Sequence, residues 1–352
     1  MRKPAAEDRF VEHLVRGFVR DPRQLNLPHE SDAELVRIPG AETVLAVTVD
    51  QIVEEVRTGL YDDPYLLGWM TVTASASDLA AVGADPLGIL VGQVFPHNVQ
   101  PAFLDRLQQG IGEASVAARL PVLGGDTAFD SAPSMSATAF GIIRDGRPLT
   151  RRGAAAGHRL FGTGPLGLGS VFAWAKRKGQ PTPEFQPQAR LQAGALARRH
   201  ASAAVDTSDG FLAACDLLLP ADGLDLVVQA DSADYLHLEA VGLARELSVP
   251  GWLLLAGPHG EFELLVAVPE GKVAPFVTEA KALGIPLLEI GVFHTGSGMV
   301  QIPGDGVAVD PARVRDLHPD AAADPRGFLR SLSACARTLS RSQRNVARHA
   351  YS

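Results

Sequence analysis

Residues 204–219 read AVDTSDGFLAACDLLL: a short apolar run ending in Asp206, a turn that contains Asp209, and a second apolar run with helical spacing. A serine or aspartate before such a run is a common helix N-cap, because its oxygen accepts from backbone N–H groups that have no partner within the helix. Ser208 is placed to serve as such a cap. A cap accounts for one carboxylate only, since two close carboxylates repel unless a cation or a proton lies between them. The stretch therefore predicts a strand, a carboxylate-bearing turn and a helix, with a cap or a cation site at the turn.

The composition excludes several classes of protein. The chain has 352 residues, 46% of them hydrophobic and 20% charged, with a formal net charge of −8. This balance predicts a globular protein that does not bind nucleic acid generally. Two cysteines without a C-x-x-C pair argue against a disulfide framework or a zinc site. The charged N-terminus is unlike a signal peptide, and no apolar run approaches the roughly 20 residues of a membrane span. We expect a cytoplasmic protein without a membrane partner.

Apolar periodicity predicts two α+β domains, residues 1–148 and 149–315, followed by a tail, residues 316–352. The boundary falls in RDGRPLTRRGAAAG (144–157), where Gly, Pro and charge occur together. Strands are expected at 43–50, 87–95, 136–143, 159–163, 203–206, 224–230, 262–268 and 287–293. Helices are expected at 66–83, around 103–111, and at 168–178, 188–199, 210–219, 236–247 and 272–283.

The tail is rich in arginine and contains no acidic residue after position 325. Its apolar residues share one helical face: Phe328, Leu332, Cys335, Ala336 and Leu339. A helix that covers its own domain is the favoured interpretation, and a docking segment for an acidic partner is the alternative.

Six aspartates recur in one context, in which an apolar element ends and small residues follow: Asp32, Asp50, Asp78, Asp126, Asp206 and Asp209. Each alone is typical of a cap or a turn. Together they predict a site for a hard cation, because the ligands are oxygens without neighbouring His or Cys. Carboxylates gathered from distant segments suit Mg²⁺, which keeps waters and completes its shell with substrate phosphates.

Two glycine-rich segments bear on phosphate binding. GGDT (124–127) allows backbone N–H groups to approach a phosphate, since no Cβ intervenes. A G-x-G-x-x-G pattern at Gly162, Gly164 and Gly167 is interpreted as a tight turn from strand to helix, with a dinucleotide site as the minority alternative. The chain has no G-x-x-x-x-G-K-[ST] pattern and is therefore not a P-loop protein.

Nine segments occur in order: SDAELV, TVDQIVEE, SDLAAVGADP, GGDT, RRGAAAG, GTGPLGLG, VDTSDG, GEFELL and GIPLLEIG. The series, over about residues 28–298, resembles the superfamily of thiamine-monophosphate kinase, aminoimidazole ribonucleotide synthetase and selenophosphate synthetase. The kinase branch fits best, through VDQIVEE, DTSDG and IPLLEIG. Selenophosphate chemistry is disfavoured because it needs an N-terminal cysteine or selenocysteine, and the first cysteine here is Cys215.

The resemblance implies a homodimer in which the N-terminal sheets pair into a barrel, with ATP in the cleft between the two domains of each subunit. It implies Mg²⁺ bound by Asp32, Asp50, Asp78, Asp126 and Asp209, to which the residue pattern adds Asp206. Gly124, Gly125, Asp126 and Thr127, with Ser208, would contact the nucleotide. Asp209 and Arg151 would act in catalysis, the arginine by stabilising the charge of the transferred phosphoryl group.

Three departures from the kinase pattern affect the prediction. Ser31 precedes Asp32 where that branch has a second aspartate, Arg57 stands where it has a histidine, and Glu261 replaces an aspartate. The sequence thus predicts a Mg²⁺-dependent, ATP-using phosphotransferase acting on thiamine monophosphate or on another small acceptor. Arg57 hints at an anionic group on that acceptor. The alternatives are a synthetase that activates a carbonyl by phosphorylation, and a nucleotide-binding paralogue with impaired catalysis.

Overall fold

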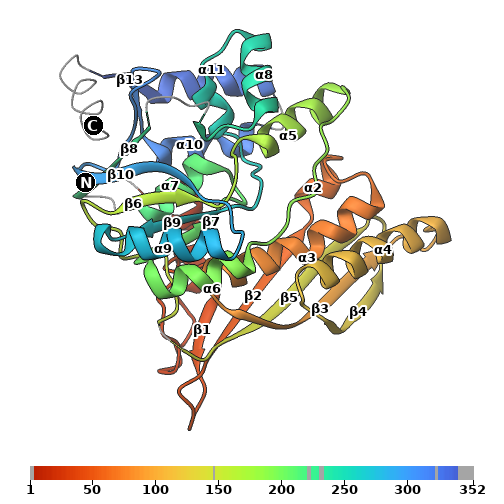
Figure 1. Cartoon of the computed structure of the whole chain (residues 1–352). Helices are drawn as coiled ribbons and strands as arrows, with labels where there is room; N and C mark the ends of the chain where they lie inside the picture. Colours follow the sequence, from red (N-terminus) through yellow and green to blue (C-terminus); the bar gives the residue numbers. More distant parts are fainter. Residues whose placement is uncertain (1–3, 146, 220–222, 230–233, 322–323, 340–352) are drawn as a thin grey trace.

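The computed structural model describes residues 4–145, 147–219, 223–229, 234–321 and 324–339, and it contains two sheets that follow each other along the chain (Figure 1). The first sheet has the order β1-β2-β5-β3-β4, and only the β3–β4 pair is parallel. Its strands are β1 (Glu34–Arg37), β2 (Val44–Ile52), β3 (Asp85–Phe95), β4 (Val122–Phe129) and β5 (Ser134–Ile143).

Two helices, α3 (Pro64–Ala81) and α4 (Pro101–Ala117), cover one face of this sheet (Figure 1). Each begins with proline at its first position, where a missing N–H costs nothing. The helices contact each other closely at two glycines: a Cβ on Gly68 would lie 2.1 Å from the carbonyl oxygen of Leu107, and one on Gly110 equally close to that of Tyr65. Small residues at the crossing therefore set the distance between α3 and α4.

The second sheet has the order β13-β12-β11-β8-β10-β6-β9-β7. Its strands are β6 (Arg159–Gly162), β7 (Ala203–Asp206), β8 (Gly223–Val228), β9 (Leu264–Val268), β10 (Leu288–Gly296), β11 (Val300–Ile302), β12 (Val307–Val309) and β13 (Ala336–Thr338). Strands β7 and β9 are buried throughout, because helices cover both faces of the sheet. Ala203 and Val205 enter one core and Ala204 the other, as strand alternation requires.

The helices around the second sheet lie in two layers. Those on one face are α6 (Leu191–His200) and α9 (Glu270–Ala282). The other core is built with α5 (Leu168–Lys178), α7 (Phe211–Leu218), α8 (Leu238–Leu247), α10 (Pro311–Leu317) and α11 (Pro325–Cys335), together with the short helices η2 (Gly251–Leu255) and η3 (His318–Asp320).

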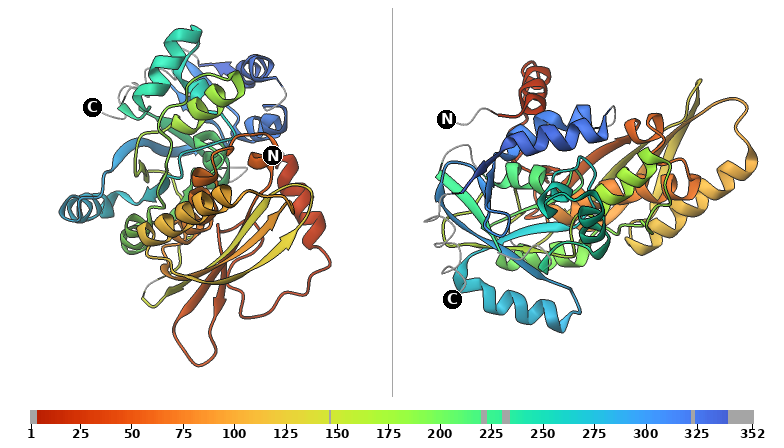
Figure 2. Two further views of the ribbon diagram at one scale, coloured as in Figure 1. Left: turned by 90° about the vertical axis from the view of Figure 1, so that its right-hand side faces the viewer. Right: turned by 90° about the horizontal axis from the view of Figure 1, so that it is seen from above.

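Helix α3 joins the two halves, since it packs on β2 and β5 of the first sheet and also on α6 and β7 of the second half. Two further helices complete the described chain: α1 (Ala6–Val15), which contacts α10, and the single turn α2 (Glu54–Arg57) (Figure 2). Among the described residues, no helix combines the length and the apolar character needed to cross a bilayer.

The predicted mixed α+β fold with two sheets is confirmed, and the strands predicted at 43–50, 87–95, 136–143 and 203–206 correspond to β2, β3, β5 and β7. The predicted tail helix is too long. Helix α11 ends at Cys335, and Ala336 begins β13, because the edge strand β12 offers unpaired backbone groups. Residues 340–352 of the tail lie outside the described residues. The division into 1–148, 149–315 and 316–352 stays a prediction, and its first boundary falls between β5 and β6.

Candidate active site: a buried carboxylate cluster

Four separate segments bring carboxylates to the place where α3 passes between the two sheets. Asp50 lies near the end of β2, Asp78 in the last turn of α3, and Asp206 at the end of β7, while Asp32 lies in the loop before β1. The packing of α3 on β2 and β7 brings these segments together. Ser75 and its small neighbours on α3 are fully buried and leave room for this approach.

The cluster is compact. Asp32, Asp78 and Asp206 each offer one carboxylate oxygen, and these atoms all lie within 4.8 Å of one another. Asp50 adjoins them, since its charge helps to raise the pKa of Asp78, and Ser75 Oγ donates to Asp50 Oδ2 at 2.8 Å. Thr48 Oγ1 likewise donates to Asp78 Oδ2 at 2.5 Å.

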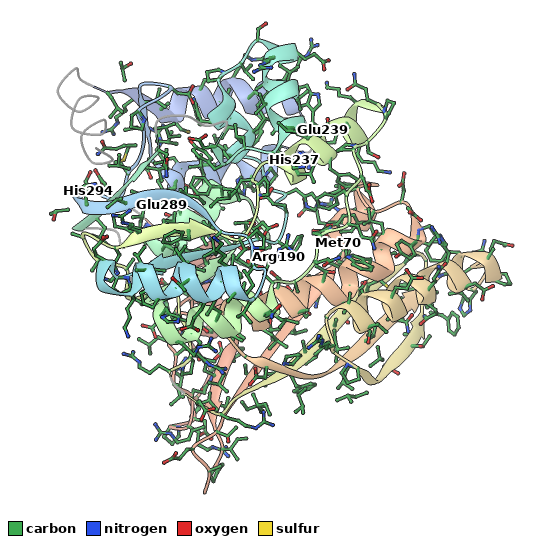
Figure 3. All side chains as sticks on the ribbon, in the orientation of Figure 1. Met70, Arg190, His237, Glu239, Glu289 and His294 are labelled. Carbon is green, nitrogen blue, oxygen red and sulfur yellow. The ribbon has the colours of Figure 1, made fainter. Side chains whose placement is uncertain are left out.

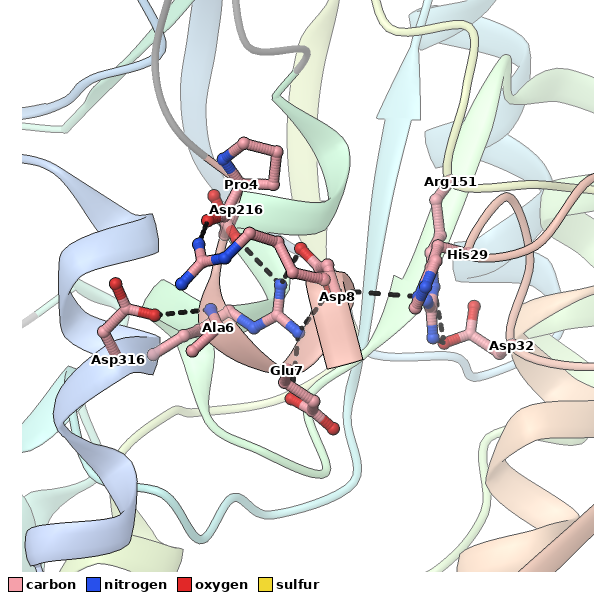
Figure 4. Close-up of polar contacts among 11 residues, drawn as sticks. Pro4, Ala6, Glu7, Asp8, His29, Asp32, Arg151, Asp216 and Asp316 are labelled. Carbon is pink, nitrogen blue, oxygen red and sulfur yellow. Dashed lines mark hydrogen bonds and ion pairs between the residues drawn. The ribbon is translucent and has the colours of Figure 1, made fainter. Parts of the chain in front are cut away.

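Arg151 is the cation attached to this cluster, and its guanidinium donates to Asp32 Oδ1 at 3.0 Å (Figure 4). The backbone N–H of Arg151 also donates to the carbonyl of Glu30 at 2.7 Å, which ties the loop carrying Asp32 to the start of the second half. The role predicted for Arg151 in charge stabilisation stays a prediction. Its contacts place it against a cluster carboxylate.

Burial makes the cluster electrostatically costly without a bound cation. It raises the pKa of Asp206 to about 7, with the nearby Asp32 adding to the shift. The pKa of Asp78 rises well above its usual range through burial and through the charges of Asp50, Asp206 and Asp32. Burial also raises the pKa of Asp50, against the hydrogen bond from Ser75. The single positive charge of Arg151 does not neutralise the four carboxylates of the cluster.

The donor set fits a hard divalent cation. Asp32 Oδ2 and Asp206 Oδ2 are both buried and have no hydrogen-bond partner among the described residues. A buried carboxylate oxygen without a partner carries a desolvation cost that a cation would remove. All the ligands are oxygens, as Mg²⁺ prefers, and the set is too small for a full cage. The residues present therefore fit Mg²⁺.

The turn 206–210 does not use its serine as predicted. Ser208 Oγ donates to Asp206 Oδ1 at 2.8 Å, so it orients the cluster carboxylate. Gly210, at φ +83°, holds the N-cap position of α7, and no side chain caps that helix. The prediction that Ser208 caps the helix is therefore wrong. The N-cap of α7 is Gly210, two residues after Ser208, so the Ser208 hydroxyl does not occupy the cap position. The predicted contact of Ser208 with the nucleotide stays a prediction.

Asp209 lies beside the cluster rather than in it. It lines a cavity of about 520 Å³ between α1, α2 and α10, and desolvation by the surrounding chain raises the pKa of its carboxyl group to about 6. The charge of Asp209 still acts on Glu55 across this cavity, as does that of Asp50, and both add to the burial that raises the pKa of Glu55. The cavity and the carboxylate cluster are thus neighbours.

Within one subunit the structure does not bring Asp126 to the cluster. Asp50 pairs with Ala137, Ala137 with Val91, and Val91 with Gly125, so Gly125 lies on the same face of the sheet as Asp50. Its neighbour Asp126 lies on the opposite face, because successive strand residues alternate. Asp126 is exposed on the edge strand β4.

The GGDT segment forms the middle of β4. A Cβ at Gly125 would lie 2.0 Å from the carbonyl oxygen of Val91, so close strand pairing accounts for that glycine. The nucleotide contacts predicted for Gly124, Gly125, Asp126 and Thr127 stay a prediction.

The glycines of GTGPLGLG form the turn between β6 and α5, as interpreted from the sequence. Glu261 Oε2 accepts from the backbone N–H of Gly167 at 2.8 Å, at the start of α5. Burial raises the pKa of Glu261 to about 8. The protein's own glutamate therefore occupies the helix N-terminus at which a dinucleotide phosphate would bind.

A second cavity, of about 610 Å³, lies between α5 and the segment that leads to α6, and its lining includes Arg190, His237 and Glu239 (Figure 3). Its buried charges are already engaged: Arg190 Nε donates to Glu263 Oε2 at 2.7 Å, and Thr163 Oγ1 donates to the same oxygen. This lining does not point to a ligand of particular chemistry.

Sequence reasoning missed three residues at the site: Thr48, Glu55 and Arg177. Thr48 could have been found, since it precedes Asp50 by two positions and so shares its face of the strand. Glu55 and Arg177 come from α2 and α5 and meet only across the 520 Å³ cavity, so local spacing could not reveal them.

Residues 30–143, which hold three of the four cluster carboxylates, match the family model described as AIR synthase related protein, N-terminal domain. Fold and match together place this segment in the AIR synthase related class. The chain is 30% identical over 325 residues to a Caulobacter vibrioides protein named thiamine-monophosphate kinase, and the alignment covers 90% of this chain and 91% of that protein. The chain belongs to the thiamine-monophosphate kinase family.

Two solved structures share the fold. AaThiL complexed with AMPPCP and TMP superposes with a TM-score of 0.69 at 20% identity, over 84% of this chain and 92% of that one. Thiamine monophosphate kinase from Aquifex aeolicus superposes with a TM-score of 0.67 at 19% identity, over 84% and 95% of the two chains.

Proposed function

We propose that this chain is an ATP-dependent kinase that transfers the γ-phosphoryl group of ATP to thiamine monophosphate with the help of Mg²⁺. The observation that carries the proposal is the buried cluster of Asp32, Asp78 and Asp206, with two carboxylate oxygens left without partners. Family membership, through the Caulobacter vibrioides relative, supports the kinase activity and the acceptor.

In this proposal Asp32, Asp78 and Asp206 hold Mg²⁺, with Asp50 and Asp209 flanking them. A bound Mg²⁺ would neutralise phosphate charge during transfer. Ser208 and Arg151 keep the carboxylates of Asp206 and Asp32 oriented through the hydrogen bonds that they donate. Such supporting contacts matter, because a small displacement of a ligand weakens a metal site.

Transfer would be direct and in line. An oxygen of the acceptor phosphate forms a bond to the γ-phosphorus while the bond from that phosphorus to the β–γ bridging oxygen breaks, which yields ADP and a diphosphate. The second pKa of a phosphate monoester is about 6, so the attacking oxygen carries no proton at neutral pH. The protein therefore has to position and shield the reactants, and it does not have to supply a nucleophile.

The proposal includes a homodimer that pairs the first sheets into a barrel. Helices α3 and α4 cover one face of that sheet, while apolar side chains such as Val49 and Leu90 are exposed on its other face, at 64% and 40%. Strand β4 is exposed along its whole length, with Val122, Leu123 and Phe129 among its residues. An apolar face of this kind is typical of a protein interface.

The proposal also places the enzyme in the cytoplasm. Cys215 and Cys335 support this placement, since both are free and buried. Free thiols persist in reducing compartments.

Calorimetric titration of a non-hydrolysable ATP analogue, with and without Mg²⁺, tests the proposal, followed by the same titration with thiamine monophosphate present. We expect Mg²⁺-dependent binding, its loss in Asp206→Asn, and turnover of ATP when thiamine monophosphate is added. Mg²⁺-dependent binding with no turnover would instead favour the impaired paralogue. Ser31 motivates that alternative, since its hydroxyl donates to the backbone carbonyl of Ala33 and it adds no carboxylate to the site. ATP consumption that needs both a carbonyl compound and an amine would favour the synthetase.

A further inference from the structure

The 520 Å³ cavity beside the carboxylate cluster has the size of a small-molecule site. Its walls come from α1, α2, the end of α5, the DTSDG turn and α10, with Asp209 on the wall nearest the cluster. Three arginines line it: Arg57, Arg177 and Arg315. Their contacts show which of them is free for a ligand.

Arg315 is occupied by the protein itself. Its guanidinium donates to Asp216 Oδ2 at 2.9 Å, to Asp8 at 2.9 and 3.0 Å and to Glu7 at 3.0 Å, and these bonds hold α1 against α10 (Figure 4). Arg57 is largely exposed, at 74%, and lies 3.8 Å from Glu54. Neither arginine requires an external anion.

Arg177 differs from both. It is half-buried, and none of the described residues forms a hydrogen bond or an ion pair with its guanidinium. Its neighbours in the last turn of α5 each have an interaction of their own: Lys176 pairs with Asp62, and Lys178 Nζ lies 5.3 Å from the centre of the Trp174 ring. Burial lowers the pKa of Arg177, and the charge of Glu54 in the same cavity opposes this shift only in part, which reflects the cost of holding the guanidinium away from water.

The two histidines of the cavity do not share its positive charge at neutral pH. Burial, with the charge of Arg177 added, lowers the pKa of His259 to about 3, and burial lowers that of His318 to about 4. The carboxylates of the lining are Glu7, Glu54, Glu55, Asp209 and Asp316. The cavity therefore offers one half-buried cation without a hydrogen-bonded partner, together with carboxylates on its other walls.

We infer that this cavity receives the phosphoryl acceptor and that Arg177 binds the anionic group of that acceptor, a phosphate monoester. Arg57, the last residue of α2, lines the same cavity and adds positive charge there. The inference rests on the proposed kinase function and extends it, because it assigns an acceptor-binding residue that comes from α5 and not from the aspartate motifs. The surrounding carboxylates suit an acceptor that also carries a positive group.

The test compares Arg177→Met with Lys178→Met, which removes the adjacent charge of the same helix turn away from the cavity. Steady-state kinetics give KM for thiamine monophosphate and KM for Mg²⁺-ATP. Calorimetric titration with inorganic phosphate probes the subsite without turnover. We expect Arg177→Met to raise KM for thiamine monophosphate at least tenfold, to leave KM for ATP within about twofold and to abolish phosphate binding. Arg177→Lys should recover part of the loss, and Lys178→Met should match the unchanged chain.

The outcomes separate the inference from the proposed function. An unchanged KM for thiamine monophosphate in Arg177→Met, with normal turnover, would overturn the subsite and leave the kinase intact. Equal increases of both KM values would also overturn it, since they indicate general damage. If the unchanged chain does not turn over thiamine monophosphate but binds inorganic phosphate only when Arg177 is present, the subsite stands and the acceptor assignment falls.

Discussion

Replacement of Asp206 by asparagine should stabilise the metal-free protein, although it removes a side chain of the proposed active site. Burial and the charge of Asp32 raise the pKa of Asp206 from 3.8 to about 7. At about 1.36 kcal/mol per pKa unit, this difference corresponds to about 4 kcal/mol of destabilisation once the carboxylate is ionised. Because the cluster carboxylates share protons, this figure is an upper value for one replacement.

The pH dependence has a definite sign. The pKa of Asp206 is higher in the folded than in the unfolded state, so its contribution favours folding fully below about pH 4 and is lost as the pH rises through about 7. We therefore expect the free energy of unfolding of the unchanged chain in EDTA to fall over this window. Asp206→Asn should show a shallower fall and be more stable at pH 8.

Urea denaturation in EDTA and in Mg²⁺, from pH 5 to 8, measures both effects. Mg²⁺ at 100 times its dissociation constant should add about 2.7 kcal/mol to the unchanged chain and much less to Asp206→Asn. Asp225→Asn is the matched control, since this buried aspartate accepts from Ser297 N, Met299 N and Gln301 Nε2 and should be destabilised in both buffers. If Asp206→Asn were less stable than the unchanged chain in EDTA at pH 8, the electrostatic reasoning would be refuted.

Three further predictions concern packing, a buried acid and the dimer. Gly68→Ala should lower the unfolding free energy, measured by urea denaturation, by about 1–3 kcal/mol, because α3 and α4 must separate to admit the methyl group. Gly112→Ala on α4 is the control: nothing lies within 4 Å of the new Cβ, so this variant should not be destabilised. Burial raises the pKa of Glu261 to about 8, so this side chain is mainly neutral at pH 7. Glu261→Gln should therefore unfold at nearly the same urea concentration as the unchanged chain, whereas Glu261→Ala should lose about 1–3 kcal/mol of unfolding free energy. Val49→Asp, on the exposed sheet face, should shift the protein toward monomer in light scattering after size-exclusion chromatography, and an unshifted mass would count against the proposed barrel interface.

Spacing in the sequence predicted individual elements where the pattern was strong. The apolar run before Asp50 and the helix around Ser75 and Asp78 were both predicted, because burial of a strand or helix leaves a periodic pattern. Strand β4 and the end of α11 were not predicted, since each depends on a partner strand that local sequence does not reveal.

The choice of cluster members shows the same limit. Six aspartates looked alike in the sequence, yet the packing of α3 on β2 and β7 brings four of them together and leaves Asp209 at the neighbouring cavity. The register of β4 places Asp126 on the other face of the sheet. Arg177 carried no motif at all.

The sequence by itself determined the two-sheet α+β fold, the acidic chemistry of the site and the family resemblance, because periodicity and residue type are local properties of the chain. The tertiary structure alone decided which carboxylates share one buried space, which oxygens there lack partners, and which arginine faces a cavity without an ion pair. Those properties depend on distances between segments far apart in the chain, and such distances are set only when the helices and sheets pack.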